Sequence, residues 1–461
     1  MAVQVLEGRP GNLTPDQEEK LRKLWLALLQ LYGVVEAHEE STADATTSTE
    51  QSGTADAEKQ KKKRFRVFRK NKDDSKAQSG TPSVKVAAED DKYGQTQQYH
   101  ETLAKHSPET IRETIWAMVK HDHPDALALR FLRARKWDVD KALVMMISTL
   151  NWRHSDMHVD DDIMKNGEAG AVADAASSDA KSQKMGNDFL AQIRMGKSFL
   201  HGTDKNGRPI CVVRARLHKQ GEQCEESLER YTVYLIESTR MVLSPPVDTA
   251  TIIFDMTGFS MANMDYTPVK FMIKCFEANY PESLGAVLIH HSPWLFQGIW
   301  KVIRGWLDPV VASKVHFTNN VADLSEFIEP SQIMKELGGD DNWEYEYTEP
   351  IPGENDKMKD TATRDSLIED RHAIVKQFEE ATIEWIENPE AAEAKAIKDR
   401  RDQLAAQLKQ GYWKLDPFIR ARSFYDRTRV IQPDGTVNWR AASEPQPEVP
   451  KGPETSADDL D

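Results

Sequence analysis

The chain has 461 residues, of which 39% are hydrophobic and 29% charged; this length exceeds one hydrophobic core and predicts two or three structural units joined by polar segments. The 60 Lys and Arg against 75 Asp and Glu give a formal net charge of −15, which argues against a generally basic nucleic-acid-binding protein. The three scattered cysteines and the lack of a signal peptide predict a reducing, cytoplasmic compartment. No run reaches the ~20 apolar residues that span a bilayer, so membrane contact is expected to be peripheral.

The first predicted element is an amphipathic helix within residues 1–40. Thr14 has the residue type of an N-cap, Pro15 suits the first helical position, and Gln17 completes a capping box. Leucines and Trp25 follow at helical spacing. An isolated helix of this length is marginally stable, so the apolar stripe needs a partner surface. We expect it to dock onto the same chain, with a membrane or another protein as the alternative.

Residues 41–94 are expected to be a disordered linker, because the first half lacks large apolar side chains. The segment 59–72 holds nine basic residues and no acidic one, with Phe and Val interleaved. This pattern fits adhesion to an anionic membrane surface, but also a nuclear-import signal, an RNA contact or a solvated tether. The expected adhesion residues are Lys61, Lys62, Lys63, Arg64 and Arg66.

Residues 95–155 are expected to form a helical lobe. Ser107 and Asp138 have the residue types of N-caps, and Pro108 and Pro124 suit the first turns of helices. The next stretch, 156–185, is rich in Asp, Ala, Gly and Ser and is expected to be a loop-rich connector.

Residues 186–348 change to alternating strands and helices. Apolar runs predict strands at 210–214, 251–255, 286–290 and 314–318, and helices at 226–243, 268–280 and 294–307. This alternation is typical of an α/β sheet with parallel character. Residues 349–430 predict a helical extension, and residues 431–461 a disordered tail.

The residues give little support to an enzyme. The segment GFSMA nearly matches a nucleophile elbow, but Ala262 replaces the last glycine, and Ser260, His290 and Asp308 follow in the wrong order for that fold. His290 and His291 would point to opposite faces of a strand, and no third metal ligand stands at a diagnostic spacing. Phosphate-binding glycine motifs are missing. We expect no catalysis, no metal and no cofactor.

The predicted helix at 294–307, WLFQGIWKVIRGWL, is apolar around most of its circumference. Such a helix is either central to a core or has apolar material on two sides. A lid over an apolar cavity meets the second condition, because one side touches ligand and the other touches membrane when the lid opens. The expected lid and cavity residues are Trp294, Phe296, Ile299, Trp300, Ile303 and Trp306.

Five segments occur in a family-specific order: LALRFLRARKWDVDKAL, DKNGRPI, IIFDMTGFS, ANYPESLG and WLDPVVASK. Together they resemble the CRAL-TRIO lipid-binding superfamily, in its fungal phosphatidylinositol transfer branch, over residues 95–345. The resemblance implies a helical N-terminal lobe and a mixed five-stranded sheet flanked by helices. Sheet and helices would enclose a cavity for one phospholipid, which is a ligand and not a cofactor.

The resemblance also implies a head-group site made of Arg135, Lys136, Glu282 and Lys314. Cations suit a phosphodiester and a carboxylate can accept inositol hydroxyls; the alternative is a set of surface salt bridges. Two positions depart from the family pattern, since Ser283 stands where an Arg is frequent and Val311 where a Thr is frequent.

Members of the family that carry phosphatidylcholine place hydroxyl side chains on the strand ending in IIFD, and the matching positions here are Ala250 and Ile252. Tyr266 and His291 are candidate substitute donors. The resemblance therefore implies selectivity for phosphatidylinositol over phosphatidylcholine.

These features predict a monomeric, non-enzymatic carrier that moves phosphatidylinositol between membranes. It would work in the cytoplasm and bind anionic surfaces of endosomal, microsomal or lipid-droplet membranes. The alternatives are a carrier or sensor of another apolar ligand, such as a sterol precursor, and a scaffold that binds no lipid.

Overall fold

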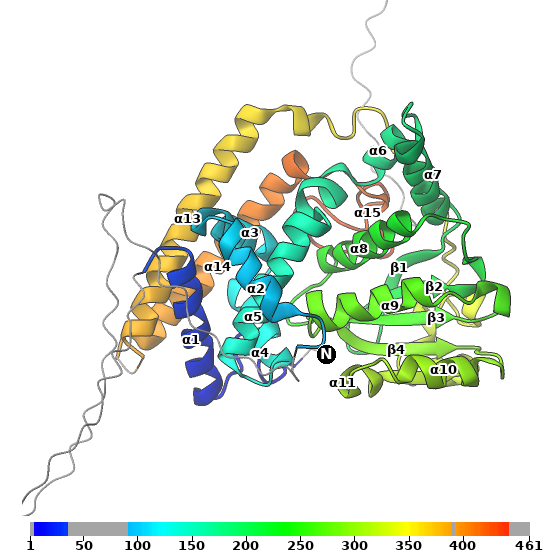
Figure 1. The fold of residues 1–461 in the computed structure, drawn as a ribbon, viewed down its shortest axis with the longest axis horizontal. Helices are drawn as coiled ribbons and strands as arrows, with labels where there is room; N and C mark the ends of the chain where they lie inside the picture. Colours follow the sequence, from blue (N-terminus) through cyan, green and yellow to red (C-terminus); the bar gives the residue numbers. More distant parts are fainter. Residues whose placement is uncertain (1–3, 36–90, 390–391, 442–461) are drawn as a thin grey trace, which may run out of the picture.

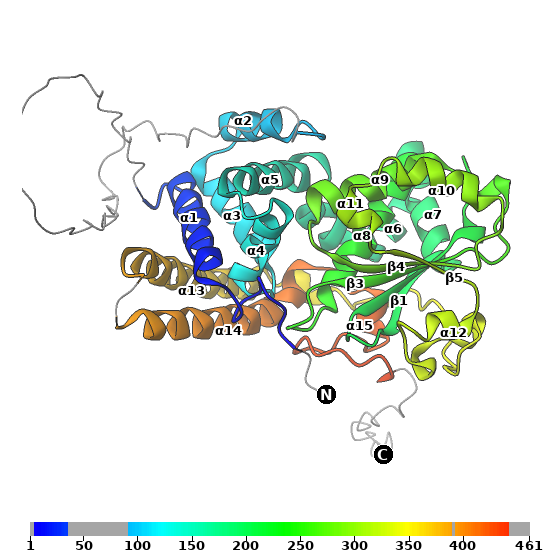
Figure 2. The ribbon, with the colours of Figure 1, turned by 90° about the horizontal axis from the view of Figure 1, so that it is seen from below.

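The computed structural model describes residues 4–35, 91–389 and 392–441. The polybasic segment 59–72, with the five expected adhesion residues, lies outside these ranges, as do most of the predicted linker and residues 442–461. The described chain forms a helical lobe beside a lobe built around one β-sheet (Figure 1, Figure 2).

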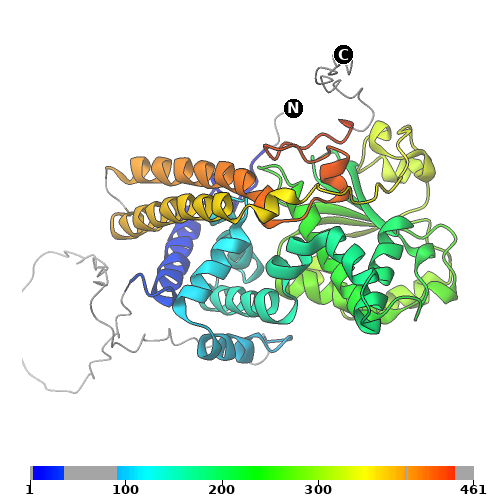
Figure 3. The ribbon, with the colours of Figure 1, turned by 90° about the horizontal axis from the view of Figure 1, so that it is seen from above.

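The helical lobe combines helices from both ends of the described chain. They are α1 (Pro15–Leu31), α2 (Gln95–Lys105), α3 (Pro108–Val119), α4 (Pro124–Ala134), α5 (Val139–Asn151), α13 (Thr361–Glu387) and α14 (Ala394–Ile419). Helices α13 and α14 run side by side along the lobe (Figure 3). The apolar faces of α1, α3, α4, α5, α13 and α14 meet in one core, so the C-terminal extension is part of this lobe.

Helix α1 docks onto this lobe, as its apolar stripe predicted. The capping box of Thr14 and Gln17 is formed, and Trp25 is buried against α3 and α13. The Trp25 indole Nε1 donates a 2.7 Å hydrogen bond to Asp125 of α4, whose carboxylate also pairs with Arg401 of α14. The chain itself covers the stripe, so this face of α1 is not presented to a membrane.

The expectation of a loop-rich connector at 156–185 is wrong. Two π-helical turns, Trp152–Asp156 and Val159–Ile163, lead into α6 (Met164–Ala175) and α7 (Ala180–Arg194). A Cβ added at Gly186 would lie 2.4 Å from the backbone nitrogen of Ala175. The small Ala and Gly residues, which led to the prediction of a loop, therefore allow α6 and α7 to pack closely.

The sheet is five-stranded and mixed, as expected. Its strands lie in chain order, β1 (Ser198–Thr203), β2 (Pro209–Arg214), β3 (Ala250–Asp255), β4 (Leu284–His290) and β5 (Val315–Thr318). The β1–β2 pair is antiparallel and the other pairs are parallel. Strand β1 was not predicted, because SFLHGT has neither a clear alternation nor a continuous apolar run.

Two different coverings protect the faces of the sheet. On one side lie α8 (Glu225–Met241), α9 (Tyr266–Lys274) and α10 (Phe296–Arg304), with the short α11 (Pro309–Ala312) beside them. Helix α9 continues as a π-helical turn, Cys275–Asn279. The other side packs against α12 (Val321–Leu324) and the segment that follows it. Short 3-10 turns complete the fold: Ala215–Leu217, Met261–Asn263, Pro330–Gln332, Lys335–Leu337 and Asp356–Lys359.

After α14 the chain returns to the sheet lobe through α15 (Phe424–Arg427). The Tyr425 hydroxyl accepts a 2.9 Å hydrogen bond from the backbone N–H of Leu200 in β1. Ile431 is buried and forms a bridge with Val437, so the expected disordered tail does not begin at residue 431. Buried apolar side chains such as Val430 and Ile431 hold the segment after α14 against the sheet lobe, although its overall composition is polar.

Candidate functional site

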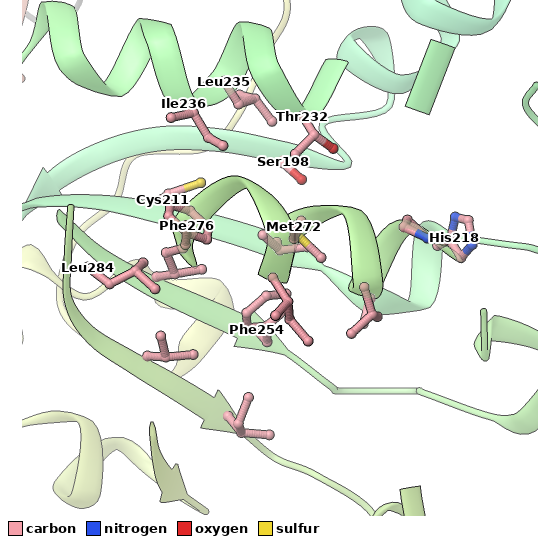
Figure 4. A pocket seen from close by; sticks show the side chains of 18 of the residues that line it. Ser198, Cys211, His218, Thr232, Leu235, Ile236, Phe254, Met272, Phe276 and Leu284 are labelled. Carbon is pink, nitrogen blue, oxygen red and sulfur yellow. The ribbon is translucent and has the colours of Figure 1, made fainter. Parts of the chain in front are cut away.

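A cavity of about 280 Å³ lies between the sheet and the helices α8, α9 and α10 (Figure 4). Most of its lining is apolar, and the sheet and all three helices contribute. The apolar wall includes Cys211, Phe254, Leu284, Val287, Leu235, Ile236, Met272 and Phe276. Such a surface excludes water and favours hydrocarbon.

Strand β3 forms the floor of the cavity through alternate residues. Ala250 and Ile252 line it, whereas Thr251 donates a 2.7 Å hydrogen bond to Asp204 instead. Ile252 lies beside Cys211 and Val287 in the sheet register, and burial raises the pKa of the Cys211 thiol to about 12. The floor therefore presents neutral, apolar groups at both positions implied by the resemblance.

The six predicted lid residues lie in different environments. Phe296, Trp300 and Ile303 of α10 line the cavity, and Ile299 is buried in the same apolar cluster. Trp294 is 88% exposed.

The prediction of a helix from residue 294 is wrong, because Trp294 lies in the turn before α10. The backbone N–H of Gln297 donates to the Trp294 carbonyl at 3.2 Å, closing this turn. Trp306 follows the helix and packs against Tyr266, with ring centroids 5.2 Å apart.

The outer side of α10 carries exposed apolar and basic side chains together. Lys301 and Arg304 of α10 are exposed. Large hydrophobic side chains exposed around them are Trp294, Val302, Val310, Phe317 and Tyr266. None of the described helices is long and apolar enough to cross a membrane. This surface, named here the lid surface, has the composition of an interfacial contact.

Charged side chains gather where β3 and β4 begin. Burial lowers the pKa of Lys314, and the nearby cations Arg208 and Arg9 lower it further. The carboxylates Glu282 and Asp248 have the opposite effect and raise it. Lys314 and Glu282 thus lie in one cluster, and their role as head-group ligands stays a prediction. Ser283 and Leu284, which follow Glu282, line the cavity, so the charges stand at one end of the apolar chamber.

Asp248 joins three distant parts of the chain at this end. Its carboxylate accepts two hydrogen bonds of 3.2 Å from Arg9 and one of 2.8 Å from Arg133 of α4. Arg130, one turn earlier on α4, donates a 3.0 Å hydrogen bond to the Glu282 carbonyl. We call Arg9, Arg130, Arg133, Arg208, Lys314, Asp248 and Glu282 the charged rim.

The two cations expected from the resemblance, Arg135 and Lys136, lie just after the end of α4. Arg135 donates a hydrogen bond to the Gln95 side chain, and Lys136 is exposed beyond the end of the helix. Both stay predictions as head-group ligands. Arg130 and Arg133 were missed although they lie three residues apart, on one helical face, within the quoted motif. Arg9 carried no signal in the sequence.

The two adjacent histidines do not point to opposite faces. Strand β4 ends at His290, and His291 has a left-handed backbone with φ of 53°. Their rings stack with centroids 4.0 Å apart, and burial and His291 together lower the pKa of His290 to about 4. Within residues 4–35, 91–389 and 392–441, no cluster of His, Cys, Asp and Glu could hold a metal.

Comparison with known proteins agrees with this architecture. Residues 193–339 match the CRAL/TRIO domain model and residues 95–148 match its N-terminal domain model. A CRAL-TRIO domain-containing protein of Schizosaccharomyces pombe is 43% identical over 92% of this chain and 93% of its own.

Two further relatives bear names that state what they transfer. The phosphatidylinositol transfer protein CSR1 of Eremothecium gossypii is 40% identical over 91% of this chain and 97% of its own. The phosphatidylinositol/phosphatidylcholine transfer protein SFH12 of Arabidopsis thaliana is 28% identical over 48% of this chain and 40% of its own. With this similarity extending over nearly the whole length of two fungal proteins, the chain belongs to the CRAL-TRIO family.

Proposed function

We propose that this protein binds one phosphatidylinositol molecule in its cavity and transfers or presents it between membranes. The observation that carries the proposal is an apolar chamber with the charged rim at one end. A phospholipid has the matching distribution of chemistry, since its acyl chains are apolar and its head group is anionic.

The chamber explains how a lipid is kept in solution. Each buried acyl CH₂ is stabilised by about 0.8 kcal/mol relative to water. The sheet floor and the helices α8, α9 and α10 supply an apolar surface for these groups. During transfer, the apolar wall of the cavity would surround the acyl chains as the membrane interior does.

The charged rim supports an inositol phospholipid. Its five cations outnumber the carboxylates Asp248, Glu282 and Asp204, the last of which lies 3.7 Å from Arg208, and they stand in a chain whose overall charge is −15. Cations bind a phosphodiester through charge-assisted hydrogen bonds, while a carboxylate accepts hydrogen bonds from hydroxyl groups. The full-length similarity to a protein named as a phosphatidylinositol transfer protein supports the same ligand.

The lid surface supports loading at a membrane. Trp300 and Phe296 face the cavity, whereas Trp294, Lys301 and Arg304 face outward. One helix can therefore exchange contacts with the ligand for contacts with a bilayer when it moves. The protein would bind anionic membranes peripherally and act as a monomer.

A second candidate is a carrier or sensor of a different apolar ligand. It is favoured by the floor at Ala250 and Ile252, which offers no hydroxyl to a buried polar head group. The two functions are compatible if the ligands alternate in one chamber.

The deciding experiment uses the full chain. Native mass spectrometry of the purified protein should show one phosphatidylinositol per polypeptide, and labelled phosphatidylinositol should move between vesicles in its presence. Protein that takes up a hydrocarbon or sterol but neither binds nor transfers phosphatidylinositol would establish the second function instead. Protein that takes up no lipid would be a scaffold.

A further inference from the structure

The cavity has a second polar end, away from the charged rim. Lys197, Ser198, Gln192, Thr232 and His218 line it there. Figure 4 shows the Ser198 and Thr232 hydroxyls among the lining side chains, with His218 farther along the wall. Nothing in the proposed transfer of phosphatidylinositol uses these groups.

The sheet register places this end opposite the rim. Ser198 pairs with Val213, which pairs in turn with Phe254 near the end of β3, whereas Asp248 and Ala250 stand at its beginning. A six-residue strand spans about 17 Å at ~3.3 Å per residue. A phospholipid whose head group lies at the rim would therefore bring only the apolar ends of its acyl chains toward Lys197.

Lys197 is a buried cation with too few partners. It is 7% exposed, and its ammonium donates hydrogen bonds to the neutral side-chain oxygens of Gln223 at 2.9 Å and Gln192 at 3.4 Å. An ammonium has three N–H donors, and in the described part of the chain no carboxylate lies within ion-pair distance of this one. Burial lowers the pKa of Lys197 to about 8, as expected for a cation without a counter-ion.

Ser198 adds a second unused group beside it. The residue is buried, and its backbone carbonyl accepts a 2.7 Å hydrogen bond from Tyr231. Its side-chain hydroxyl makes no hydrogen bond within the ranges that the structure describes. This end of the apolar chamber thus holds a buried cation whose two acceptors are neutral amide oxygens, and a hydroxyl that makes no hydrogen bond in the described part of the chain. Buried charges in folded proteins are usually paired with an opposite charge.

The two carboxylates that act on Lys197, Asp265 and Glu222, do not serve as its acceptor. Asp265 accepts a 3.2 Å hydrogen bond from His218 and a 3.0 Å hydrogen bond from the backbone of Thr267, where it caps α9. Glu222 is exposed to solvent. Both favour the charged form of Lys197 from a distance, but neither provides its missing acceptor.

We propose that this end of the cavity is a second ligand site, which binds the carboxylate of a long-chain fatty acid through Lys197 and Ser198. The hydrocarbon chain then runs along the apolar wall toward the charged rim. A carboxylate supplies both an acceptor and the missing negative charge. Fatty acid and phosphatidylinositol would share the chamber, so each excludes the other.

The experiment compares oleic acid with its methyl ester, which has the same chain but no charge. The purified full-length protein should bind oleic acid at least about tenfold more tightly than methyl oleate, as measured by titration and by native mass spectrometry. Lys197→Met should remove this preference, and Ser198→Ala should reduce it. Lys219→Met is the matched control, because Lys219 is exposed and the same change there should have no effect.

Two outcomes overturn the proposal. Equal affinity of the wild-type protein for the acid and the ester would show that no carboxylate site exists, whatever the variants do. A retained preference in folded Lys197→Met would remove Lys197 from the site. A Lys314→Ala arm separates this inference from the proposed function, since that variant should lose phosphatidylinositol and keep the preference for oleic acid.

Discussion

Replacing Lys314 with alanine should weaken phosphatidylinositol binding and transfer while leaving the fold intact. Lys314 is half-buried at the charged rim, and Glu282 is the carboxylate that acts on it most strongly. Burial and the cations Arg208 and Arg9 lower the pKa of Lys314. Its charge therefore costs stability until an anionic ligand compensates for it.

The magnitude follows from the loss of one charge-assisted hydrogen bond. Such a bond to a phosphate contributes about 1.5–3 kcal/mol, which corresponds to roughly a 10- to 150-fold loss of affinity. The melting temperature of the ligand-free protein should stay the same or rise, because repulsion from the neighbouring arginines is relieved. Opposite effects on binding and stability are typical of residues retained for function.

Transfer of labelled phosphatidylinositol between vesicles and thermal unfolding of ligand-free protein measure the two effects. Lys335→Ala is the control, since Lys335 is an exposed lysine on the segment that packs against the other face of the sheet. Unchanged transfer by folded Lys314→Ala would reassign the rim to surface salt bridges. Loss of transfer that merely follows a loss of melting temperature would make Lys314 a structural residue.

Three more variants, one of them a double substitution, test the lid, the floor and a buried ion network. Trp300→Glu should slow lipid exchange between vesicles more than it lowers the melting temperature, because Trp300 faces the cavity from α10; proportionate losses would indicate a plain core residue. We expect the wild-type protein to transfer phosphatidylcholine poorly, and Ala250→Ser combined with Ile252→Thr should raise this transfer roughly a hundredfold, through two hydroxyls of about 1–3 kcal/mol each; no rise would refute the selectivity argument. Burial alone would raise the pKa of Glu237, but Arg153 and other cations hold this pKa well below its usual range. Because the carboxylate is then more acidic in the folded than in the unfolded protein, its charge stabilises the fold at neutral pH. Urea unfolding should therefore show that stability is lost as the pH falls below about 5. Glu237→Gln should lower the unfolding free energy at pH 7 by about 3–5 kcal/mol and flatten this pH dependence, whereas an unchanged profile would assign the acid sensitivity to other groups.

Local sequence signals predicted most helices and four strands of the sheet. The capping box at Thr14 and the N-cap residue Asp138 mark helices that the structure confirms, because a cap depends on residues within one helical turn. The same reasoning failed at 156–185, where Ala and Gly serve close helix packing. It also failed at β1, whose pairing with β2 depends on residues that are not its immediate neighbours.

The sequence by itself determined the family resemblance, most of the helix at α10 and, through that resemblance, the positions Ala250 and Ile252, since the order of motifs can be read along the chain. Only the tertiary structure revealed the charged rim, in which Arg9 meets Asp248 across 239 positions of the chain. It also revealed that Lys197, an ordinary lysine in the sequence, is buried at the far end of an apolar chamber. The physical reason is that desolvation and charge pairing depend on which residues folding brings together, and spacing along the chain does not encode this.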